Sequence, residues 1–493
     1  MRNAVGCSGN RVYCERRIKM QLEQTIAKLR EDYHVAGMSV ALIRNGELVS
    51  IDGYGLRNVA ENLPMTRDTV MPIGSITKTF TSLALAMLAD EGKLNWDEPV
   101  KTYIPWLRLN NELLTENVTA RDLMCHRTGT PKYDLQAIYA ATDDKEEMVR
   151  SLEHLQTFAP FRTKFMYSNQ MVSLAGYLVD VLSGTSYEDF VRERIFAPLG
   201  MTSSDFEADS LSKYENTSRG YIFAGEFIEP PYMHLGAFAP SGAIVSSAED
   251  MARFAMFQLG DGTWNGRRLV SEAMLNEVHS HQMIGTPYFW EFEEIQCAEY
   301  GLGWFTDIYR GRKMINHGGN TNGFSAQMTL IPSEKFAVVA LSNATSNFAV
   351  NALGHYAADD ALGVEDVPDW SARFSEIFAN LMQGAMAGMK AKEEAKVPDT
   401  TPSVPFENLA GAYSHPGFGT MEFAWTDQGL AGTWNGLPAM LAHYNYDAFD
   451  LMLPVLGATV PAEFVYRDGA VCGLSVTMEP TPGVKPELFV KAG

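Results

Sequence analysis

The segment Ser75-Ile-Thr-Lys78 opens a long apolar stretch and predicts a helix with two polar side chains on its first turn. Apolar residues recur at helical spacing through Leu88, and Gly92 marks the expected end of the helix. Residues three apart lie on one face of a helix. Ser75 and Lys78 are therefore expected to point into the same space, at a helix N-terminus.

This pair has the composition of an activated nucleophile. A serine hydroxyl is a poor nucleophile at neutral pH and needs a base within hydrogen-bond reach to take its proton. Lys78 is placed to supply one, and a lysine acts as such a base only where burial or a neighbouring cation lowers its pKa. The free backbone N–H groups of a helix N-terminus stabilise a developing oxyanion, so the N–H of Ser75 is expected to form one arm of an oxyanion hole.

Two further motifs, Tyr167-Ser-Asn169 and His317-Gly-Gly319, follow in the chain. Each motif alone is weak, because Ser210-Leu-Ser-Lys213 also has the serine–lysine spacing in a polar, loop-like segment. Singly, Ser75 could be a helix cap, Lys78 a solvated residue, Tyr167 a core aromatic and His317 a hydrogen-bonded strand residue. The glycines after His317 indicate a tight bend or a close backbone approach. In this order, the three motifs favour a serine hydrolase that works through a covalent acyl-enzyme.

The surroundings of these motifs resemble the penicillin-recognising serine hydrolases over roughly residues 20 to 365. The nearest groups by motif are class C beta-lactamases, D-aminopeptidases, D,D-carboxypeptidases and related esterases. The segments that carry the resemblance are Pro72–Lys78, Gly92–Val100, Tyr103–Pro105, Leu123–Gly129, Phe165–Asn169, Gly242–Phe254 and Tyr300–Trp304. The resemblance implies an α+β serine beta-lactamase-like fold, with an antiparallel sheet and an all-α subdomain.

The resemblance also implies roles for individual residues. Ser75 would be acylated, and Lys78 with Tyr167 would form the proton-transfer unit, in which the identity of the base stays open. Asn169 would hold Lys78 or the amide oxygen of the substrate. The third motif would lie on the edge strand of the sheet, with His317 facing the cleft.

In that third motif, Gly318 and Gly319 follow the histidine. Gly319 would admit the substrate backbone, and the N–H of Asn320 would complete the oxyanion hole. Beta-lactamases and many carboxypeptidases have Lys-Thr-Gly here, and its lysine binds the substrate carboxylate. Imidazole is a weaker, pH-dependent partner for a carboxylate. Beta-lactamase activity is therefore not the expected main role, and the His-Gly-Gly form is shared with D-aminopeptidase-like and esterase-like members.

Three function hypotheses follow. The first is an amide or peptide hydrolase acting on a small peptide or amino-acid derivative, with a D-residue among the candidate substrates. The second is a carboxylesterase or acyltransferase with the same catalytic set. The third is a non-catalytic penicillin-binding or sensor protein, which would have no need of a nucleophile together with its base.

The chain of 493 residues is too long for one ordinary domain. We expect an N-terminal extension without a fold of its own over 1–19 and a catalytic domain over 20–365, with a helical insertion at about 80–238. A hairpin joined by Asn45-Gly46 opens that domain. The segment 366–405 is expected to be a helix over 366–389 followed by a linker over 390–405, where the composition becomes charged and rich in Pro and Thr. Alternating apolar runs and Gly-containing turns then predict a lipocalin-like antiparallel β-barrel over 406–493.

The net charge of −21 argues against partners that are nucleic acids or anionic membranes. The expected partner is a small peptide, amide or ester substrate, and a homo-oligomer stays open. Five cysteines do not suggest a disulfide framework, and the histidine spacing suggests no metal site, so no cofactor is expected. No signal segment is visible, which makes a cytoplasmic location the default, although a truncated start could hide one. The acidic run Glu291, Glu293 and Glu294 is expected to be a solvated loop.

Overall fold

A computed structural model describes residues 11–139, 142–206, 211, 213–284, 290–427 and 429–492. Its residues form two compact units. The first contains the chain up to Leu94 together with Thr185–Met233 and Gly242–Phe378, and the second contains Asn95–Gly184, His234–Ser241 and the chain from Ala379 onward. Each unit is described separately.

The first unit is built on a nine-stranded sheet with the strand order β11-β12-β13-β14-β15-β16-β1-β2-β3. All neighbouring pairs are antiparallel. The strands are β1 (Gly37–Arg44), β2 (Glu47–Asn58), β3 (Leu63–Pro64), β11 (Met283–Ile284), β12 (Ile295–Tyr300), β13 (Phe305–Tyr309), β14 (Arg312–Thr321), β15 (Phe324–Ile331) and β16 (Phe336–Ser342). The expected Asn45-Gly46 hairpin joins β1 to β2, and both turn residues have the positive φ that a type I′ turn requires.

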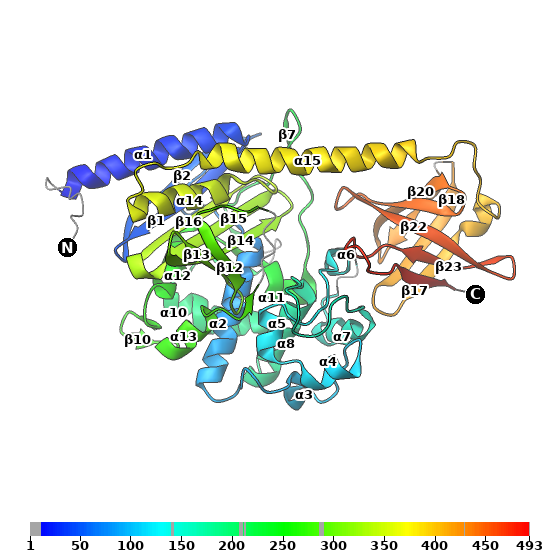
Figure 1. Ribbon diagram of the computed structural model, residues 1–493, viewed down its shortest axis with the longest axis horizontal. Helices are drawn as coiled ribbons and strands as arrows, with labels where there is room; N and C mark the ends of the chain where they lie inside the picture. Colours follow the sequence, from blue (N-terminus) through cyan, green and yellow to red (C-terminus); the bar gives the residue numbers. More distant parts are fainter. Residues whose placement is uncertain are drawn as a thin grey trace. The chain divides into compact units, whose positions relative to one another are not determined.

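Helices cover both faces of this sheet, which explains why the central strands β15 and β16 are buried along their whole length. On one face lie α1 (Arg11–Asp32), α14 (Ala349–Leu362) and the start of α15 (Trp370–Glu394), and their apolar side chains share one core cluster with alternate residues of β1 and β16. On the other face lies α12 (Ala248–Gln258) (Figure 1).

Helix α2 (Thr77–Asp90) is buried around most of its circumference. The ring of Phe80 stacks on Phe254 with centroids 3.8 Å apart and meets Phe196 edge to face at 5.7 Å. The smaller elements of the first unit are β4 (Met71–Pro72), β5 (Asp205–Phe206), β8 (Ile244–Ser246), α9 (Tyr187–Val191), a π-helical turn at Arg192–Phe196, α10 (Ala197–Leu199) and α13 (Glu272–Val278), with the hairpins β6 (Ile222–Phe223)–β7 (Phe227–Ile228) and β9 (Thr263–Trp264)–β10 (Arg267–Arg268). The packing of Phe80 therefore fixes the helix that follows Ser75.

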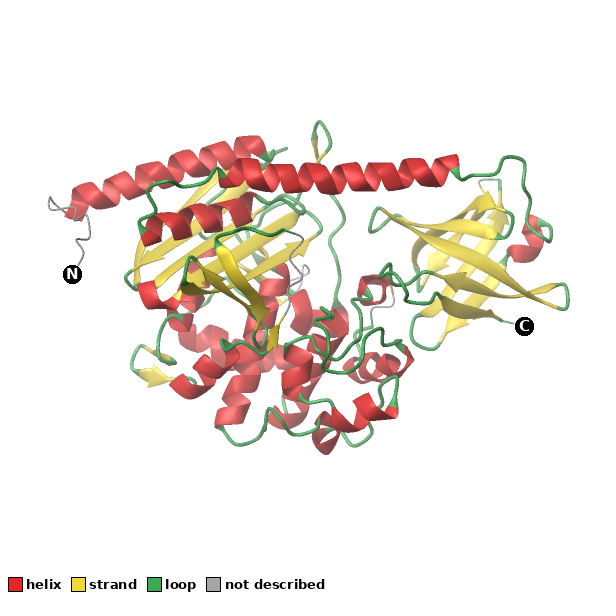
Figure 2. Ribbon diagram, in the orientation of Figure 1, coloured by secondary structure: helices red, strands yellow, loops and turns green. Residues whose placement is uncertain are grey.

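The second unit combines short helices with a closed eight-stranded antiparallel barrel (Figure 2). The helices are α3 (Val100–Tyr103), α4 (Glu112–Asn117), α5 (Ala120–Met124), α6 (Asp134–Tyr139), α7 (Lys145–Ser151), α8 (Asn169–Ser183) and α11 (Ala239–Gly242). The barrel strands are β17 (Gly411–His415), β18 (Gly419–Thr426), β19 (Gly429–Trp434), β20 (Leu437–Asn445), β21 (Ala448–Leu453), β22 (Ala458–Arg467), β23 (Ala470–Val476) and β24 (Glu487–Lys491), and β17 pairs with β24 to close it. Large side chains fill the barrel core, among them Tyr413, Trp434, Phe449, Phe464 and Phe489.

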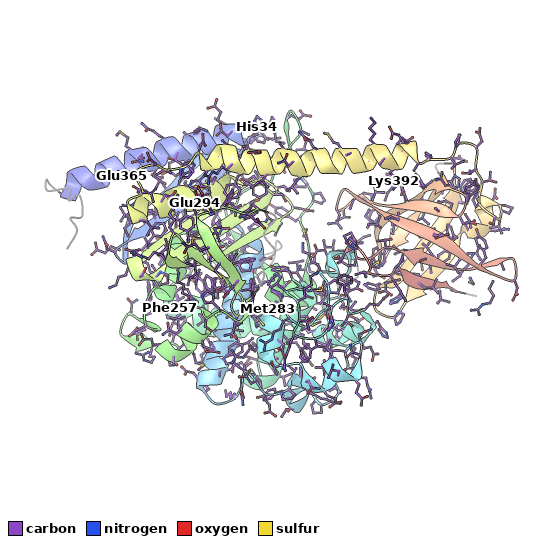
Figure 3. All side chains as sticks on the ribbon, in the orientation of Figure 1. His34, Phe257, Met283, Glu294, Glu365 and Lys392 are labelled. Atoms are coloured by element: carbon purple, nitrogen blue, oxygen red, sulfur yellow. The ribbon has the colours of Figure 1, made fainter. Side chains whose placement is uncertain are left out.

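Several local expectations need correction. Helix α1 begins at Arg11, within the expected extension 1–19, because the charged residues before Met20 are good helix formers; residues 1–10 lie outside the described residues. Helix α15 continues to Glu394, into the expected linker. Glu294, labelled in Figure 3, is not solvated: it is buried, and Arg373 donates to both of its carboxylate oxygens at 2.9 and 3.0 Å.

The expected domain boundaries stay predictions. Contacts group residues 95–184 with the barrel and not with the sheet. Within the described ranges, no helix has both the length and the apolar character that crossing a membrane requires.

Truncating Phe80 tests the packing of α2. We expect Phe80→Ala to lower the free energy of unfolding by about 3–5 kcal/mol, because the change removes a fully buried ring and leaves a cavity. The urea midpoint of the transition that involves the first unit measures this loss. The matched control is Phe223→Ala, whose ring is 40% exposed. An equal shift of the midpoint in both variants would contradict the assigned packing.

Candidate active site

Ser75 lies on a 3₁₀ turn, Gly74–Ile76, which leads directly into α2. The side chain of Lys78 is fully buried one turn later, and its Nζ donates a hydrogen bond to Ser75 Oγ over 3.0 Å. The expected helix and the shared direction of the two side chains are both present. A buried lysine amino group beside a partly exposed serine is a suitable arrangement for proton transfer.

The turn that presents Ser75 depends on a glycine. Gly74 has φ +52, a backbone conformation that favours glycine. A Cβ at this position would lie 2.8 Å from Asn320 N, so the side of the turn is also closed by strand β14. Position 74 therefore favours glycine for two reasons: a side chain would clash with β14, and other residues rarely adopt this positive φ.

Strand β14 carries the third motif against this turn. A Cβ on Gly319 would lie 1.9 Å from Ile73 O and 2.8 Å from Ser75 N, so the backbones approach as closely as glycine permits. Gly318 and Gly319 are part of an extended strand, so the two glycines serve a close approach and not a bend. Within the first unit, the structure brings together Ser75, Lys78 and the segment His317–Asn320.

The expectation that this motif lies on an edge strand is wrong for β14, which is the fourth of nine strands. The registers of β14 with its two neighbours show where each pairing ends. Strand β13 pairs with β14 only as far as Asn316, and residues from His317 to Thr321 pair with β15 alone. Among the described strands, the ladder beyond Asn316 therefore continues on the β15 side, although β14 is internal.

His317 is buried, and both of its ring nitrogens have hydrogen-bond partners. Nδ1 lies 2.6 Å from Gly318 O, and a carbonyl oxygen can only accept, so Nδ1 carries the proton. Nε2 then accepts from the hydroxyl of Tyr300 over 3.0 Å. Burial, assisted by the nearby charge of Lys78, lowers the pKa of His317 to about 3. The imidazole therefore stays uncharged across the neutral range.

In the second unit, Tyr167 and Asn169 lie at the start of α8. The ring of Tyr167 packs against His126, with centroids 4.4 Å apart, and the N–H of Ser168 donates to His126 Nδ1 over 3.1 Å. The amide of Asn169 donates to Asp134 Oδ1 over 3.1 Å. Both residues of the motif are partly exposed, and their backbone is fixed by the loop that contains His126.

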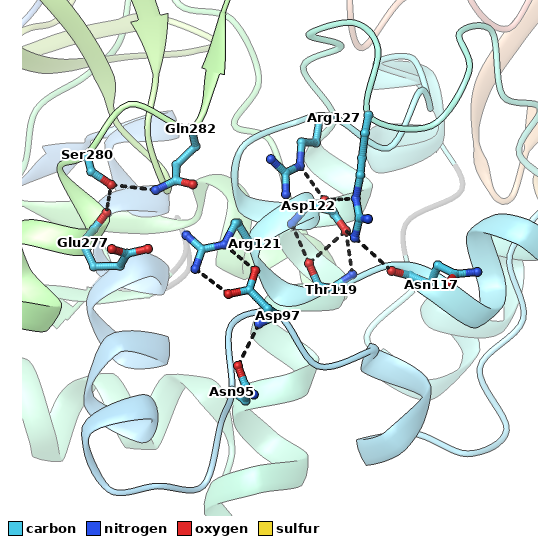
Figure 4. Close-up of polar contacts among 11 residues, drawn as sticks. Asn95, Asp97, Asn117, Thr119, Arg121, Asp122, Arg127, Glu277, Ser280 and Gln282 are labelled. Carbon is cyan, nitrogen blue, oxygen red and sulfur yellow. Dashed lines mark hydrogen bonds and ion pairs between the residues drawn. The ribbon is translucent and has the colours of Figure 1, made fainter.

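That loop is anchored by a buried carboxylate. Asp122 accepts from Thr119, from Arg127 and from both Nε and Nη2 of Arg162 (Figure 4). Burial alone would raise the pKa of Asp122, but the hydrogen bonds from Arg162 and Arg127 outweigh it and hold this pKa below its usual range. The carboxylate thus stays charged. Because it accepts from both Arg127 and Arg162, it joins the two ends of the segment that precedes Tyr167.

Sequence reasoning missed three of these residues. His126 and Tyr300 stand in segments that resemble the family, yet their spacing gives no sign that they hold Tyr167 and His317. Asp134 lies in no segment that resembles the family, and its contact with Asn169 forms only in the folded chain. Ser210 of the competing motif lies outside the described residues, and Lys213 pairs with Asp205. No group of three or more His, Cys, Asp or Glu that could hold a metal ion occurs in the described part of the chain.

Comparisons with known proteins cover most of the chain. A family model described as Beta-lactamase matches residues 22–362, and one described as a domain of unknown function, DUF3471, matches residues 395–491. The chain is 29% identical over 501 residues to "Unguisins hydrolase ungD'" of Aspergillus campestris (strain IBT 28561), covering 95% of this chain and 91% of that protein. It is 25% identical over 342 residues to "Protein flp" of Staphylococcus aureus (strain N315), covering 68% of this chain and 65% of that protein.

Two solved structures share the fold. The octameric penicillin-binding protein homologue from Pyrococcus abyssi has a TM-score of 0.62 at 23% identity and covers 94% of this chain and 98% of its own. SurE has a TM-score of 0.58 at 20% identity and covers 97% and 99%. The expected beta-lactamase-like fold, with its antiparallel sheet, helical part and C-terminal barrel, is confirmed.

Adding one methyl group to Gly319 tests the close approach of β14 to the nucleophile. We expect Gly319→Ala to lower kcat/KM for an activated ester by about 100-fold or more, because a shift of about 1 Å in a reacting group can cost that much. Gly384→Ala on the exposed part of α15, where a Cβ meets no atom within 4 Å, is the matched control and should retain native activity. A folded Gly319→Ala variant within threefold of native activity would be inconsistent with this geometry.

Proposed function

The chain belongs to the beta-lactamase family, and on that premise we propose that it hydrolyses an amide or peptide bond through an acyl-enzyme on Ser75. The proposed substrate is a small peptide or amino-acid derivative, and D-residues are included among the candidates. The observation that carries the proposal is the 3.0 Å hydrogen bond between Nζ of the buried Lys78 side chain and Ser75 Oγ. A solvated lysine or a serine used only as a helix cap would not need this burial.

The proposed reaction proceeds in two steps. Ser75 Oγ attacks the carbonyl carbon and loses its proton to the Lys78–Tyr167 pair, while the N–H groups of Ser75 and Asn320 stabilise the oxyanion. The C–N bond breaks, the amine leaves with a proton from the same pair of residues, and an ester on Ser75 remains. Water then attacks this ester, releasing the acid and restoring the serine. Asn169 is assigned to orient the substrate amide or the lysine.

Two features argue against a beta-lactam as the main substrate. A relative that matches over 91% of its own length is named a hydrolase of unguisins and not a beta-lactamase. In addition, the third motif offers a neutral imidazole whose two nitrogens already have partners, where beta-lactamases and many carboxypeptidases have a lysine. The D-aminopeptidase-like subtype and the choice of an amide over an ester belong to this proposal.

A substrate panel with matched variants tests the proposal. The panel contains D- and L-aminoacyl p-nitroanilides and p-nitrophenyl acyl esters. We expect the native protein to release p-nitroaniline and Ser75→Ala to lose about 10³-fold or more in kcat, as removal of a nucleophile does in serine hydrolases. The control is Ser333→Ala, an exposed serine on the turn before β16, which should have native rates.

Each outcome of the panel is decisive. Hydrolysis of anilides that depends on Ser75 supports the amidase, and the preferred configuration follows from the same data. Turnover of esters alone would replace the amidase by an esterase or acyltransferase. Undiminished activity of Ser75→Ala would refute the site assignment, and trapping of a probe without turnover would indicate a binding or sensor protein.

The neutral state of His317 predicts a preference in charge. A free carboxylate next to the third motif would lose hydration without gaining a cationic partner from this histidine, and such unpaired burial is costly. We expect the internal peptide bond of a small D-peptide with an amidated C-terminus to be hydrolysed about 10-fold faster, in kcat/KM, than that of the same peptide with a free C-terminal carboxylate. Equal rates, or a preference for the free acid, would show that His317 does not set this preference.

A further inference from the structure

Tyr133, in the second unit, has an unusual backbone. Its φ is +42, although it is neither glycine nor asparagine, and its side chain is fully buried. A bulky residue in this region is strained and persists only where its surroundings fix it. The contacts of Tyr133 therefore show which residues fix its backbone conformation.

On one side, two barrel carboxylates hold Tyr133. Its backbone N–H donates to Glu479 Oε2 over 2.9 Å, and its hydroxyl lies 3.4 Å from Glu487 Oε1. Glu479 is in turn fixed by the hydroxyl and N–H of Thr481, at 2.5 and 3.1 Å. Gln156 donates to Glu487 over 2.8 Å. Both carboxylates are buried, and each accepts from more than one donor, so their positions are well defined.

On the other side, Tyr133 reaches the start of α8. Its carbonyl oxygen accepts from Gln170 Nε2 over 2.7 Å, and the next residue, Asp134, accepts from Asn169 Nδ2. Gln170 also accepts from the hydroxyl of Ser168 over 3.2 Å. The side chains of the three residues that follow Tyr167 are thus tied, directly or through Gln170, to the segment that the barrel carboxylates hold.

The barrel is suited to be the fixed partner in this arrangement. Its core is filled with aromatic and aliphatic side chains, which makes it a rigid support. A second contact runs in parallel, since Gln136 Nε2 donates to Gly417 O over 3.0 Å, at the turn between β17 and β18. Two separate parts of the barrel therefore hold the segment from Tyr133 to Gln136.

We propose that Glu479 and Glu487 of the barrel are positioning residues, which act through Tyr133 to set the place of Tyr167 and Asn169. This inference rests on the proposed function, because it assigns the barrel a part in that reaction. The barrel carboxylates touch neither substrate nor nucleophile; they hold the loop that holds the Tyr-Ser-Asn motif. Loss of either carboxylate frees the strained Tyr133 backbone, and the proton-transfer group then spends less time in its productive place.

The test uses the full chain with Glu479→Ala, Glu479→Gln and the control Glu463→Ala, an exposed glutamate on β22. Titration of Ser75 with a fluorophosphonate counts intact nucleophiles, so that kcat is expressed per intact site. We expect Glu479→Ala to lower kcat by about 10- to 100-fold, with KM changed less than threefold, because a misplaced reacting group slows chemistry more than binding. Glu479→Gln keeps an acceptor for the Tyr133 N–H and should recover to within about threefold of native kcat.

A double-mutant cycle separates positioning from general support. In an Asn169→Ala background, Glu479→Ala should cost far less than in the native chain, because the two changes act on one set of contacts. If Glu479→Ala fails to fold, Glu479→Asp replaces it, since the shorter side chain withdraws the acceptor and keeps the charge. Native kcat in a folded Glu479→Ala or Glu479→Asp variant, no rescue by glutamine, or additive effects with Asn169→Ala would each overturn the inference. Activity that survives Ser75→Ala would instead refute the proposed function.

Discussion

The hydrogen bond between Lys78 Nζ and Ser75 Oγ is the interaction around which the candidate site of the first unit is arranged. The fully buried Lys78 amino group loses its hydration and needs polar partners inside the protein. This requirement fixes the 3₁₀ turn at the start of α2, which in turn needs glycine at position 74 and glycine at position 319 for the close approach of β14. Helix α2, the 3₁₀ turn before it and strand β14 are therefore packed around the pair formed by Ser75 and Lys78.

The third motif has two properties that belong together. Its backbone lies against Ser75, while its histidine is neutral and bonded on both nitrogens, to Gly318 and Tyr300. A charged side chain at this point would offer a site for a substrate carboxylate; a neutral ring mainly fixes the strand. In the second unit, buried carboxylates play the corresponding part for Tyr167, with Asp122 at one end of its loop and Glu479 and Glu487 at the other.

Local patterns in the sequence predicted a good part of this structure. The helix after Ser75, the Asn45-Gly46 hairpin and the barrel follow from spacing, turn chemistry and alternation, which act between neighbours in the chain. The errors concern contacts distant in sequence. β14 is internal because β13, β12 and β11 lie beyond it in the sheet, and Glu294 is buried because Arg373 on another element pairs with it. The positioning contacts of Tyr133 join residues more than 300 positions apart in the sequence, so no local pattern predicts them. Oligomeric state and cellular location stay predictions.

Mass spectrometry of the trapped intermediate tests the central claim most directly. The protein is mixed with a p-nitrophenyl ester, quenched in acid within the first turnovers, weighed intact and then digested. We expect one added acyl group per chain, carried by the peptide that contains Ser75, and no adduct in Ser75→Ala. An acyl group on any other residue, or rapid turnover with no covalent adduct at all, would contradict it.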